Sequence, residues 1–208
     1  MRSTGQFPCS MMEISLFFRI IVPQKSVTMD SFQQLLLRRR SSRKYTGELL
    51  TPDQTRTLLE AALLSPTSKN SRSWEFIAVE EKEMLEKLSR CKPNSCGLLA
   101  GAALAVVVMG NPLVSDAWIE DASIAAINMQ LQAESLGLGS CWVQVHNRSY
   151  SDMMSAGEYI NDLLDIPMPL EVLCVVAFGV KEKERPAAAL ELLPWEKVHV
   201  GKYSINEA

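Results

Sequence analysis

Apolar residues recur at helical spacing along much of the chain, together with the residues that begin and end helices. Ser31 and Gln34 form a capping-box pattern, which predicts a helix that runs through the following arginines and ends near 45–47. Thr51 and Gln54 repeat the pattern, with a proline at the first helical position. Three more helices are predicted over residues 81–89, 116–136 and 152–164, and Gly137 closes the second of these.

Short apolar runs between these helices predict about four strands. They are Trp74–Val79, Ala103–Met109, Ser140–Val145 and Leu170–Val180. The run Ala103–Met109 is apolar throughout, which indicates a strand covered on both faces and favours a parallel sheet. Helices that alternate with strands predict a layered α/β domain.

Length and charge narrow the possible partners. The 208 residues most simply form one domain, and a net charge of -3 gives no general reason to expect nucleic acid or an anionic membrane. Basic clusters are therefore interpreted as sites for small anions. The apolar run Ile14–Val22 is far shorter than the roughly 20 residues of a membrane span. Residues 1–28 are predicted to be an extension without function, and residues 29–208 the functional domain.

The cysteines argue against a zinc site and for a reducing compartment. Their number is odd and their spacing irregular: Cys9, Cys91, Cys96, Cys141 and Cys174. We therefore expect a cytoplasmic protein. Cys91 and Cys96 lie in a polar loop and are interpreted as ordinary thiols, with a disulfide or a redox sensor as the less favoured alternative.

The strongest chemical signal is the basic run 38–44, which places five cations within seven residues. The simpler interpretation is a solvated helix end, where cations suit the helix dipole. The alternative is a phosphate clamp, in which guanidinium groups and a serine hydroxyl bind phosphate oxygens.

Two later motifs are weak when each is taken alone. The loop Pro66–Trp74 is dense in hydroxyl and amide groups, and it is either a plain turn or a ring of donors around a polar heterocycle. Gly137–Val143 is a tight turn into a strand, whose backbone amides could face a ligand.

The three motifs together, in this order and spacing, resemble the nitroreductase family. The similar stretches are Arg39 to Tyr45, Pro66 to Trp74 and Gly137 to Trp142, and the resemblance covers about Asp30 to Tyr203. It implies homodimers that bind FMN at the subunit interface and exchange C-terminal tails. It also implies an α+β, three-layer fold with a central, mostly antiparallel sheet flanked by helices, which replaces the parallel sheet suggested by the apolar runs.

The resemblance assigns the basic run to FMN. Arg39, Arg40 and Ser41 would hold the phosphate and ribityl chain. Arg43 would lie at the pyrimidine edge of the ring, where a cation stabilises the charge gained on reduction. Arg38 and Lys44 keep the simpler interpretation.

Further FMN contacts are implied from the partner subunit, the third motif and the tail. The partner subunit would supply the second motif, through Pro66, Thr67, Ser68 and Asn70. The strand at Trp142 would place a backbone amide, from about Val143 or Gln144, against flavin N5. The family's basic pair before the tail is missing here, so Lys181, Lys183 or Arg185 must replace it, or nothing does.

The reaction implied is hydride transfer from NADH or NADPH, through flavin N5, to a nitroaromatic, a quinone or another small electron-poor acceptor, by a ping-pong mechanism. No catalytic side chain is required, which agrees with a chain of only two histidines. The alternatives are a different reaction on the same flavin fold, such as reductive dehalogenation or ring oxidation, and a flavin-binding protein without turnover.

Overall fold

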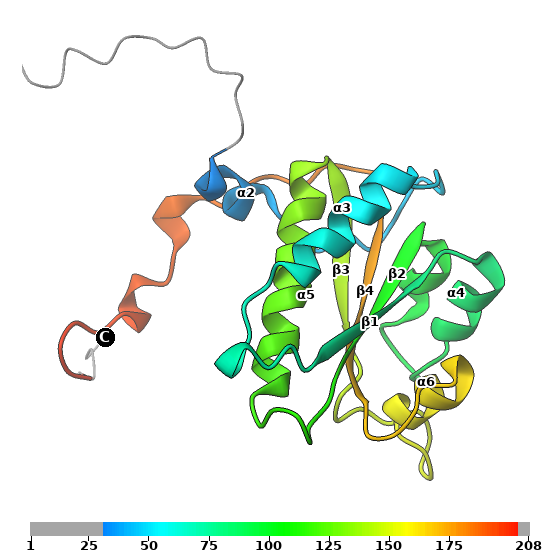
Figure 1. Cartoon of the computed structure of the whole chain (residues 1–208). Helices are drawn as coiled ribbons and strands as arrows, with labels where there is room; N and C mark the ends of the chain where they lie inside the picture. Colours follow the sequence, from blue (N-terminus) through cyan, green and yellow to red (C-terminus); the bar gives the residue numbers. More distant parts are fainter. Residues whose placement is uncertain (1–30, 204–208) are drawn as a thin grey trace, which may run out of the picture. The chain divides into compact units, whose positions relative to one another are not determined.

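The computed structural model describes residues 31–203. Its helices are α2 (Phe32–Arg38), α3 (Pro52–Leu63), α4 (Lys82–Leu88), α5 (Trp118–Ser135) and α6 (Ala156–Leu164). Its strands are β1 (Trp74–Val79), β2 (Leu104–Gly110), β3 (Leu138–Gln144) and β4 (Glu171–Val180), as Figure 1 shows. Short 3-10 helices are η1 (Ser68–Asn70), η2 (Gly97–Gly101), η3 (Leu190–Leu192) and η4 (Trp195–Lys197). The predicted extension 1–28 lies outside the described residues.

The four strands form one sheet in the order β1-β2-β4-β3, and every neighbouring pair is antiparallel. The parallel sheet suggested by the apolar runs is therefore wrong. The physical reason is that helices cover both faces, so β2 is buried at all seven positions whatever its direction. The α+β fold implied by the family resemblance is confirmed.

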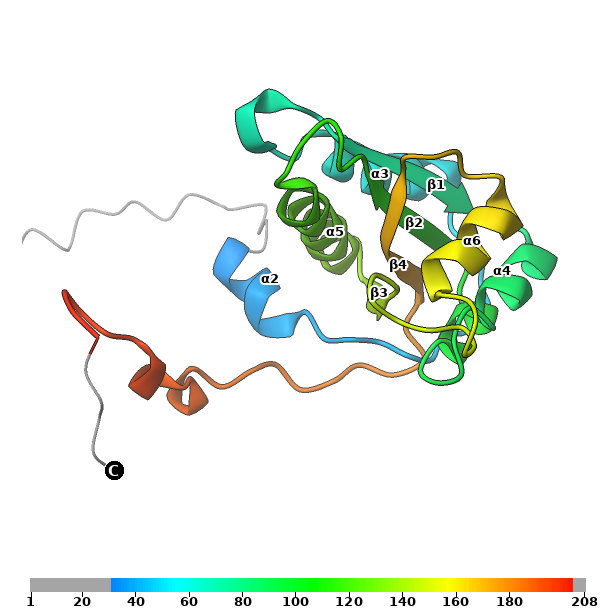
Figure 2. The same cartoon turned by 90° about the horizontal axis from the view of Figure 1, so that it is seen from below.

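Helices form a layer on each side of the sheet (Figures 1 and 2). Helices α3 and α5 pack on one face, around buried residues such as Met129 and Phe178. Helices α4 and α6 pack on the other face, around residues such as Leu85 and Ile160. The predicted three layers are confirmed.

Helix α5 is the longest helix of the described chain and lies against the sheet along its length. Its sheet-facing side is lined by small residues: Ala122, Ala125, Ala126 and Ala133 are all fully buried. These side chains let the helix lie close to β2 and β4. Gly137, with φ +72°, ends the helix in the left-handed conformation that glycine adopts without strain.

Capping groups explain where α3 and α6 begin. Thr51 and Gln54 form the predicted reciprocal cap of α3. Helix α6 begins later than predicted, because Ser155 and Glu158 form a second capping box. That pattern is visible in the sequence and was the better start signal.

The first helix ends at Arg38, not near 45–47 as predicted. Continuing the helix would place like charges one turn apart, at Arg39 and Arg43 and at Arg40 and Lys44, which is unfavourable. The chain instead becomes extended and pairs with the edge of the sheet.

The extended segment that follows α2 runs beside the segment that follows β4 (Figure 2). Tyr45 forms an antiparallel bridge with Lys181, and Ala188 N–H donates to the Leu37 carbonyl at 2.8 Å. The tail beyond exposes large apolar side chains, namely Leu190, Leu192, Leu193, Trp195, Val198, Val200 and Tyr203. Within residues 31–203, no helix combines the length and the apolar character needed to cross a membrane.

Candidate functional site

The basic segment 39–45 crosses the edge of β3 at one point. Ser41 pairs in parallel with Ser140, and Ser42 N–H donates to the Ser140 carbonyl at 2.9 Å. Gly139 permits this approach, because a Cβ there would lie 2.7 Å from Ser42 Cβ. Backbone pairing to the sheet therefore fixes the path of the arginines, rather than a helix.

Tyr45 anchors the far end of the segment. Its ring lies over Gly179, and its hydroxyl donates to the Ser42 carbonyl at 2.7 Å. Burial raises the pKa of Tyr45 well above its usual value, so the phenol remains a neutral donor. The segment is thus held at both Ser42 and Tyr45.

A small pocket, with no room for a ligand in the single chain, lies where this segment meets the end of α5 and the chain after β4. Its lining residues are Arg38, Arg40, Ser42, Glu134, Lys181, Glu184 and Arg185. Lys181 Nζ lies 3.0 Å from the buried Glu134 carboxylate and 3.1 Å from Glu184, so its charge is compensated within the protein. Among the three candidates for the missing basic pair, Arg185 lines this pocket beside Arg40, whereas Lys183 is exposed and does not line it.

Four cations act electrostatically on Cys141 of β3. Burial raises the pKa of the Cys141 thiol, and the positive charges of Arg43, Arg39, Arg185 and Lys92 oppose that rise. Along the extended segment the arginines therefore alternate: Arg40 lines the pocket, and Arg39 and Arg43 lie near Cys141. Arg185 belongs to both groups.

Beyond the crossing point, strand β3 has backbone groups that face away from the sheet; of these, the Gln144 carbonyl accepts from Lys92 Nζ and the Trp142 carbonyl from Cys141 Sγ. The Ser140 carbonyl points away from β4, because it accepts from Ser42. In an antiparallel ladder the backbone groups of alternate residues point the same way, and the β3–β4 register is unbroken. The N–H and C=O groups of Trp142 and Gln144 therefore face the open edge, whereas those of Val143 pair with β4.

The polar side-chain groups of Trp142 and Gln144 are already hydrogen-bonded within the chain. Trp142 Nε1 donates to Gln144 Oε1 at 2.9 Å, and Gln144 Nε2 donates to the His146 carbonyl at 3.0 Å. The open edge therefore offers backbone N–H donors, whose direction is set by the strand register rather than by side-chain rotamers.

The polar loop 66–73 is built around one buried carboxylate. Asp121, in the first turn of α5, is 3% exposed and accepts from Ser68 N–H at 2.7 Å. Thr67 Oγ1 accepts from Arg72 N–H at 3.0 Å. Lys69, Asn70 and Arg72 adopt positive φ, which costs energy in residues other than glycine. The loop is thus held in a strained conformation that exposes Pro66 and Asn70.

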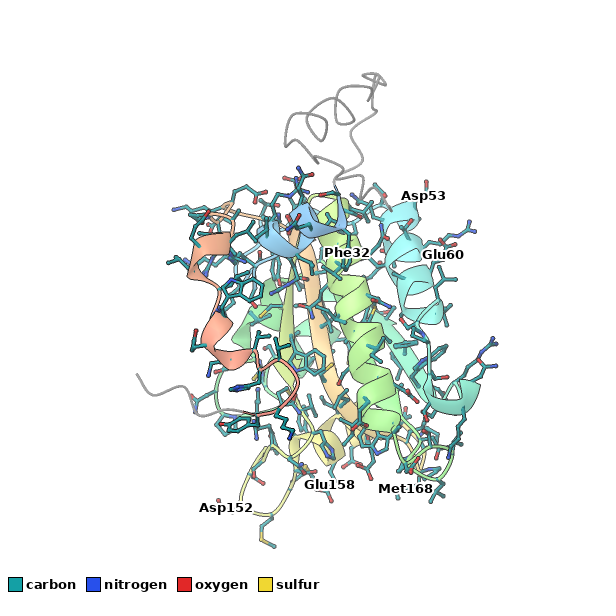
Figure 3. The ribbon with its side chains drawn as sticks, turned by 90° about the vertical axis from the view of Figure 1, so that its left-hand side faces the viewer. Phe32, Asp53, Glu60, Asp152, Glu158 and Met168 are labelled. Atoms are coloured by element: carbon teal, nitrogen blue, oxygen red, sulfur yellow. The ribbon has the colours of Figure 1, made fainter. Side chains whose placement is uncertain are left out.

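The loop and the basic segment lie at opposite ends of α5 (Figure 3, where Phe32 marks the basic end). Asp121 supports the loop and Glu134 lines the basic pocket, thirteen residues apart on the helix. At 1.5 Å per residue this is a separation of about 20 Å. One chain does not bring the two predicted halves of the site together.

Sequence patterns missed Ser42, Glu134 and Lys92 as residues of this region. Ser42 had a usable signal, since in an extended chain every second residue faces the same side as Arg40. Glu134 and Lys92 come from distant helical and loop segments, and no local pattern marks them.

Comparison with known proteins agrees with this fold. The model of the nitroreductase family matches residues 36–92 and 92–180. The chain belongs to the nitroreductase family. It is 34% identical over 161 residues to a putative NADH dehydrogenase/NAD(P)H nitroreductase of Archaeoglobus fulgidus, covering 76% of this chain and 89% of that protein.

Solved nitroreductase structures superpose on most of the chain. An FMN-dependent nitroreductase from Clostridium difficile is 43% identical with a TM-score of 0.80, covering 81% of this chain and 98% of that one. A putative NADH dehydrogenase/NAD(P)H nitroreductase from Parabacteroides distasonis is 26% identical with a TM-score of 0.76, covering 84% of this chain and 99% of the other. The nitroreductase fold thus accounts for most of the described chain.

Proposed function

We propose that this nitroreductase-family protein is an FMN-dependent oxidoreductase that uses NADH or NADPH to reduce small electron-poor acceptors, such as nitroaromatics and quinones. Family membership and relatives named NAD(P)H nitroreductase and FMN-dependent nitroreductase support this proposal. The observation that carries it is the open edge of β3, where the N–H groups of Trp142 and Gln144 face away from β4 and the charges of Arg39, Arg43 and Lys92 act on the neighbouring Cys141.

The residues present fit FMN in chemistry. A phosphate needs several charged donors, and Arg40 and Arg185 line one pocket that Ser42 also lines. A flavin ring needs backbone donors at its polar edge and a cation to balance the charge of reduction, which the β3 edge and Arg43 offer. Bound FMN supplies a ring that takes up a hydride at N5 and then gives the two electrons to a second molecule.

Most of the predicted residues keep a role in this proposal, whereas Lys183 and the Val143 amide do not. Arg39, Arg40 and Ser41 hold the phosphate and ribityl chain, and Arg185 assists from the tail side. Arg43 lies at the pyrimidine edge. Of the two amides considered for N5, we favour that of Gln144, because the Val143 amide pairs with β4.

The second half of the site would come from another copy of the chain. The loop residues Pro66, Thr67, Ser68 and Asn70 are about 20 Å from the basic pocket along α5. Large apolar side chains on α2, the outer side of α5 and the tail need cover, among them Phe32, Ile124 and Trp195. We therefore propose a homodimer with two FMN sites, in which each tail packs on the partner.

Residues 29–208 would form the FMN-binding domain, and residues 1–28 would take no part. Deleting residues 1–28 is expected to leave FMN content unchanged, and loss of FMN would refute this division. The free thiols of the described chain, at Cys91, Cys96, Cys141 and Cys174, support action in the reducing cytoplasm.

The direct test is an absorption spectrum of purified protein, before and after NADH or NADPH is added without oxygen. We expect one flavin per chain, bleached by the nucleotide and recoloured by a nitroaromatic or a quinone, with parallel lines in double-reciprocal plots. Protein that cannot be reconstituted with FMN would refute the proposal. A yellow protein that neither nucleotide bleaches would be a flavin-binding protein without turnover.

A further inference from the structure

Lys92 follows α4, in a turn that buried thiols hold in place. Cys91 is 0% exposed and Cys96 is 2% exposed, and both belong to the core between the sheet and α4. The Cys96 sulfur lies 3.0 Å from the carbonyl oxygens of Ser89 and Lys92 and can donate to either. The backbone of Lys92 is therefore fixed by its neighbours, unlike that of a lysine on a solvated loop.

The Lys92 side chain reaches the open edge of β3. Its Nζ donates to the Gln144 carbonyl at 2.9 Å. That carbonyl faces the same way as the Gln144 N–H, because the groups of one residue share an edge in an antiparallel ladder. An ammonium group has three N–H donors, so two remain beyond the one that binds the Gln144 carbonyl.

The charge of Lys92 is not balanced nearby. Across residues 31–203, no carboxylate lies within ion-pair distance of Lys92, whereas Lys181 is paired with both Glu134 and Glu184. The Lys92 charge also acts on the Cys141 thiol, together with Arg39 and Arg43. A half-buried cation without a counter-charge is costly unless it faces an anion or a group that becomes negative.

We propose that Lys92 is a further residue of the redox site, which raises the reduction potential of the bound flavin and holds the Gln144 edge in register. The inference rests on the proposed function, since it needs FMN at the β3 edge. When the ring gains electrons, a nearby fixed cation favours the reduced state. The bond to the Gln144 carbonyl would keep the adjacent amide aligned for N5.

The test compares three variants at Lys92 with a matched control. Lys92→Met removes both charge and donor, Lys92→Gln keeps a donor without charge, and Lys92→Arg keeps the charge. The control is Lys82→Met, because Lys82 Nζ also donates to a backbone carbonyl, that of Ala100 at 2.8 Å, but lies in α4 rather than in this turn. The readouts are FMN stoichiometry and the flavin midpoint potential, measured against a reference dye in full-length protein.

We expect Lys92→Met and Lys92→Gln to bind FMN but to shift the equilibrium toward the oxidised flavin by roughly tenfold, or about 30 mV for a two-electron couple. Lys92→Arg and Lys82→Met should stay close to wild type. If Lys92→Met does not fold, Lys92→Gln carries the same test. A wild-type potential in a charge-free, FMN-loaded variant would overturn the inference and leave the proposed function standing. Wild-type protein that binds no FMN would instead refute the proposed function.

Discussion

The two ends of α5 carry different kinds of binding surface. At the end near Glu134, cationic side chains stand on a backbone that is paired with the sheet. At the end near Asp121, hydroxyl and amide groups stand on a loop with positive φ angles, held by a single buried carboxylate. The first surface suits a phosphate and the second a neutral polar ring. Because one helix separates the two surfaces by about 20 Å, our proposal assigns them to two different FMN sites of a homodimer.

The largest expected effect comes from removing the cations at the first end. Arg40→Ala with Arg43→Ala should give a folded, colourless protein whose FMN affinity falls at least about a hundredfold, since hydrogen bonds to charged groups each contribute about 1.5–3 kcal/mol. Fluorescence titration with FMN measures this change. Arg56→Ala, which removes an exposed arginine paired with Glu60, is the control and should bind normally. Stoichiometric FMN in the double variant would show that the basic run is not the clamp.

Mixed dimers test whether the two ends belong to different copies. Arg40→Ala/Arg43→Ala subunits would be co-expressed with Ser68→Ala/Asn70→Ala subunits, and the heterodimer isolated by two tags. If each site combines both subunits, one of its two sites is intact, so it should bind half of the wild-type FMN. If each chain forms its own site, no site is intact and the heterodimer should be colourless.

A smaller effect is expected from Gly139→Ala, which adds a Cβ 2.7 Å from Ser42 Cβ. Displacing the basic segment should lower stability by about 1–3 kcal/mol and weaken FMN binding at that end alone. The control is Gly157→Ala in α6, where the nearest atom lies at 3.9 Å, and stability there should not fall. Thermal unfolding and FMN titration distinguish the two, and equal behaviour of both variants would mean that the segment is not held at Gly139.

The smallest expected change is at Cys91 and Cys96, the two thiols on either side of Lys92 in the sequence. We expect neither thiol to react with a thiol reagent in the native protein. Burial and the neighbouring Cys96 raise the pKa of the Cys91 thiol to about 12, so below that pH it stays protonated and unreactive. A thiol reagent at pH 8 should modify neither Cys91 nor Cys96 in native protein, and both after unfolding. Peptide mapping measures this. Rapid native labelling would show that this turn opens, as a loop would, and would revive the redox alternative.

Local sequence signals were sufficient to predict an element where residues close in sequence determine its conformation. Strand β1 was predicted with its observed bounds, and the capping box of α3 fixed its start. The signals failed at the basic run, because its partner is the edge of β3, about a hundred residues away. Helical spacing continues through Arg39 and Arg40, but pairing with Ser140 outweighs it.

The residues of the candidate site, like the elements of the fold, were predictable from the sequence only where the signal is local. Its three motifs were visible because each is continuous in sequence. The proposal prefers Arg185 to Lys183 and Gln144 to Val143 because of the pocket lining and the strand register, and the sequence alone gives neither. Lys92 was absent from the prediction, since its contact with Gln144 joins segments that share no motif.

The two glycines beneath the basic segment constrain how this enzyme can diversify. Gly139 and Gly179 face each other across β3 and β4, one under Ser42 and the other under Tyr45. In a saturation library we expect both positions to reject nearly every substitution, while the exposed Arg43 and Lys44 above them accept many changes that keep the protein folded. Ligand preference can therefore change through substitutions of the exposed side chains, while the two paired glycines keep the backbone path of the basic segment unchanged.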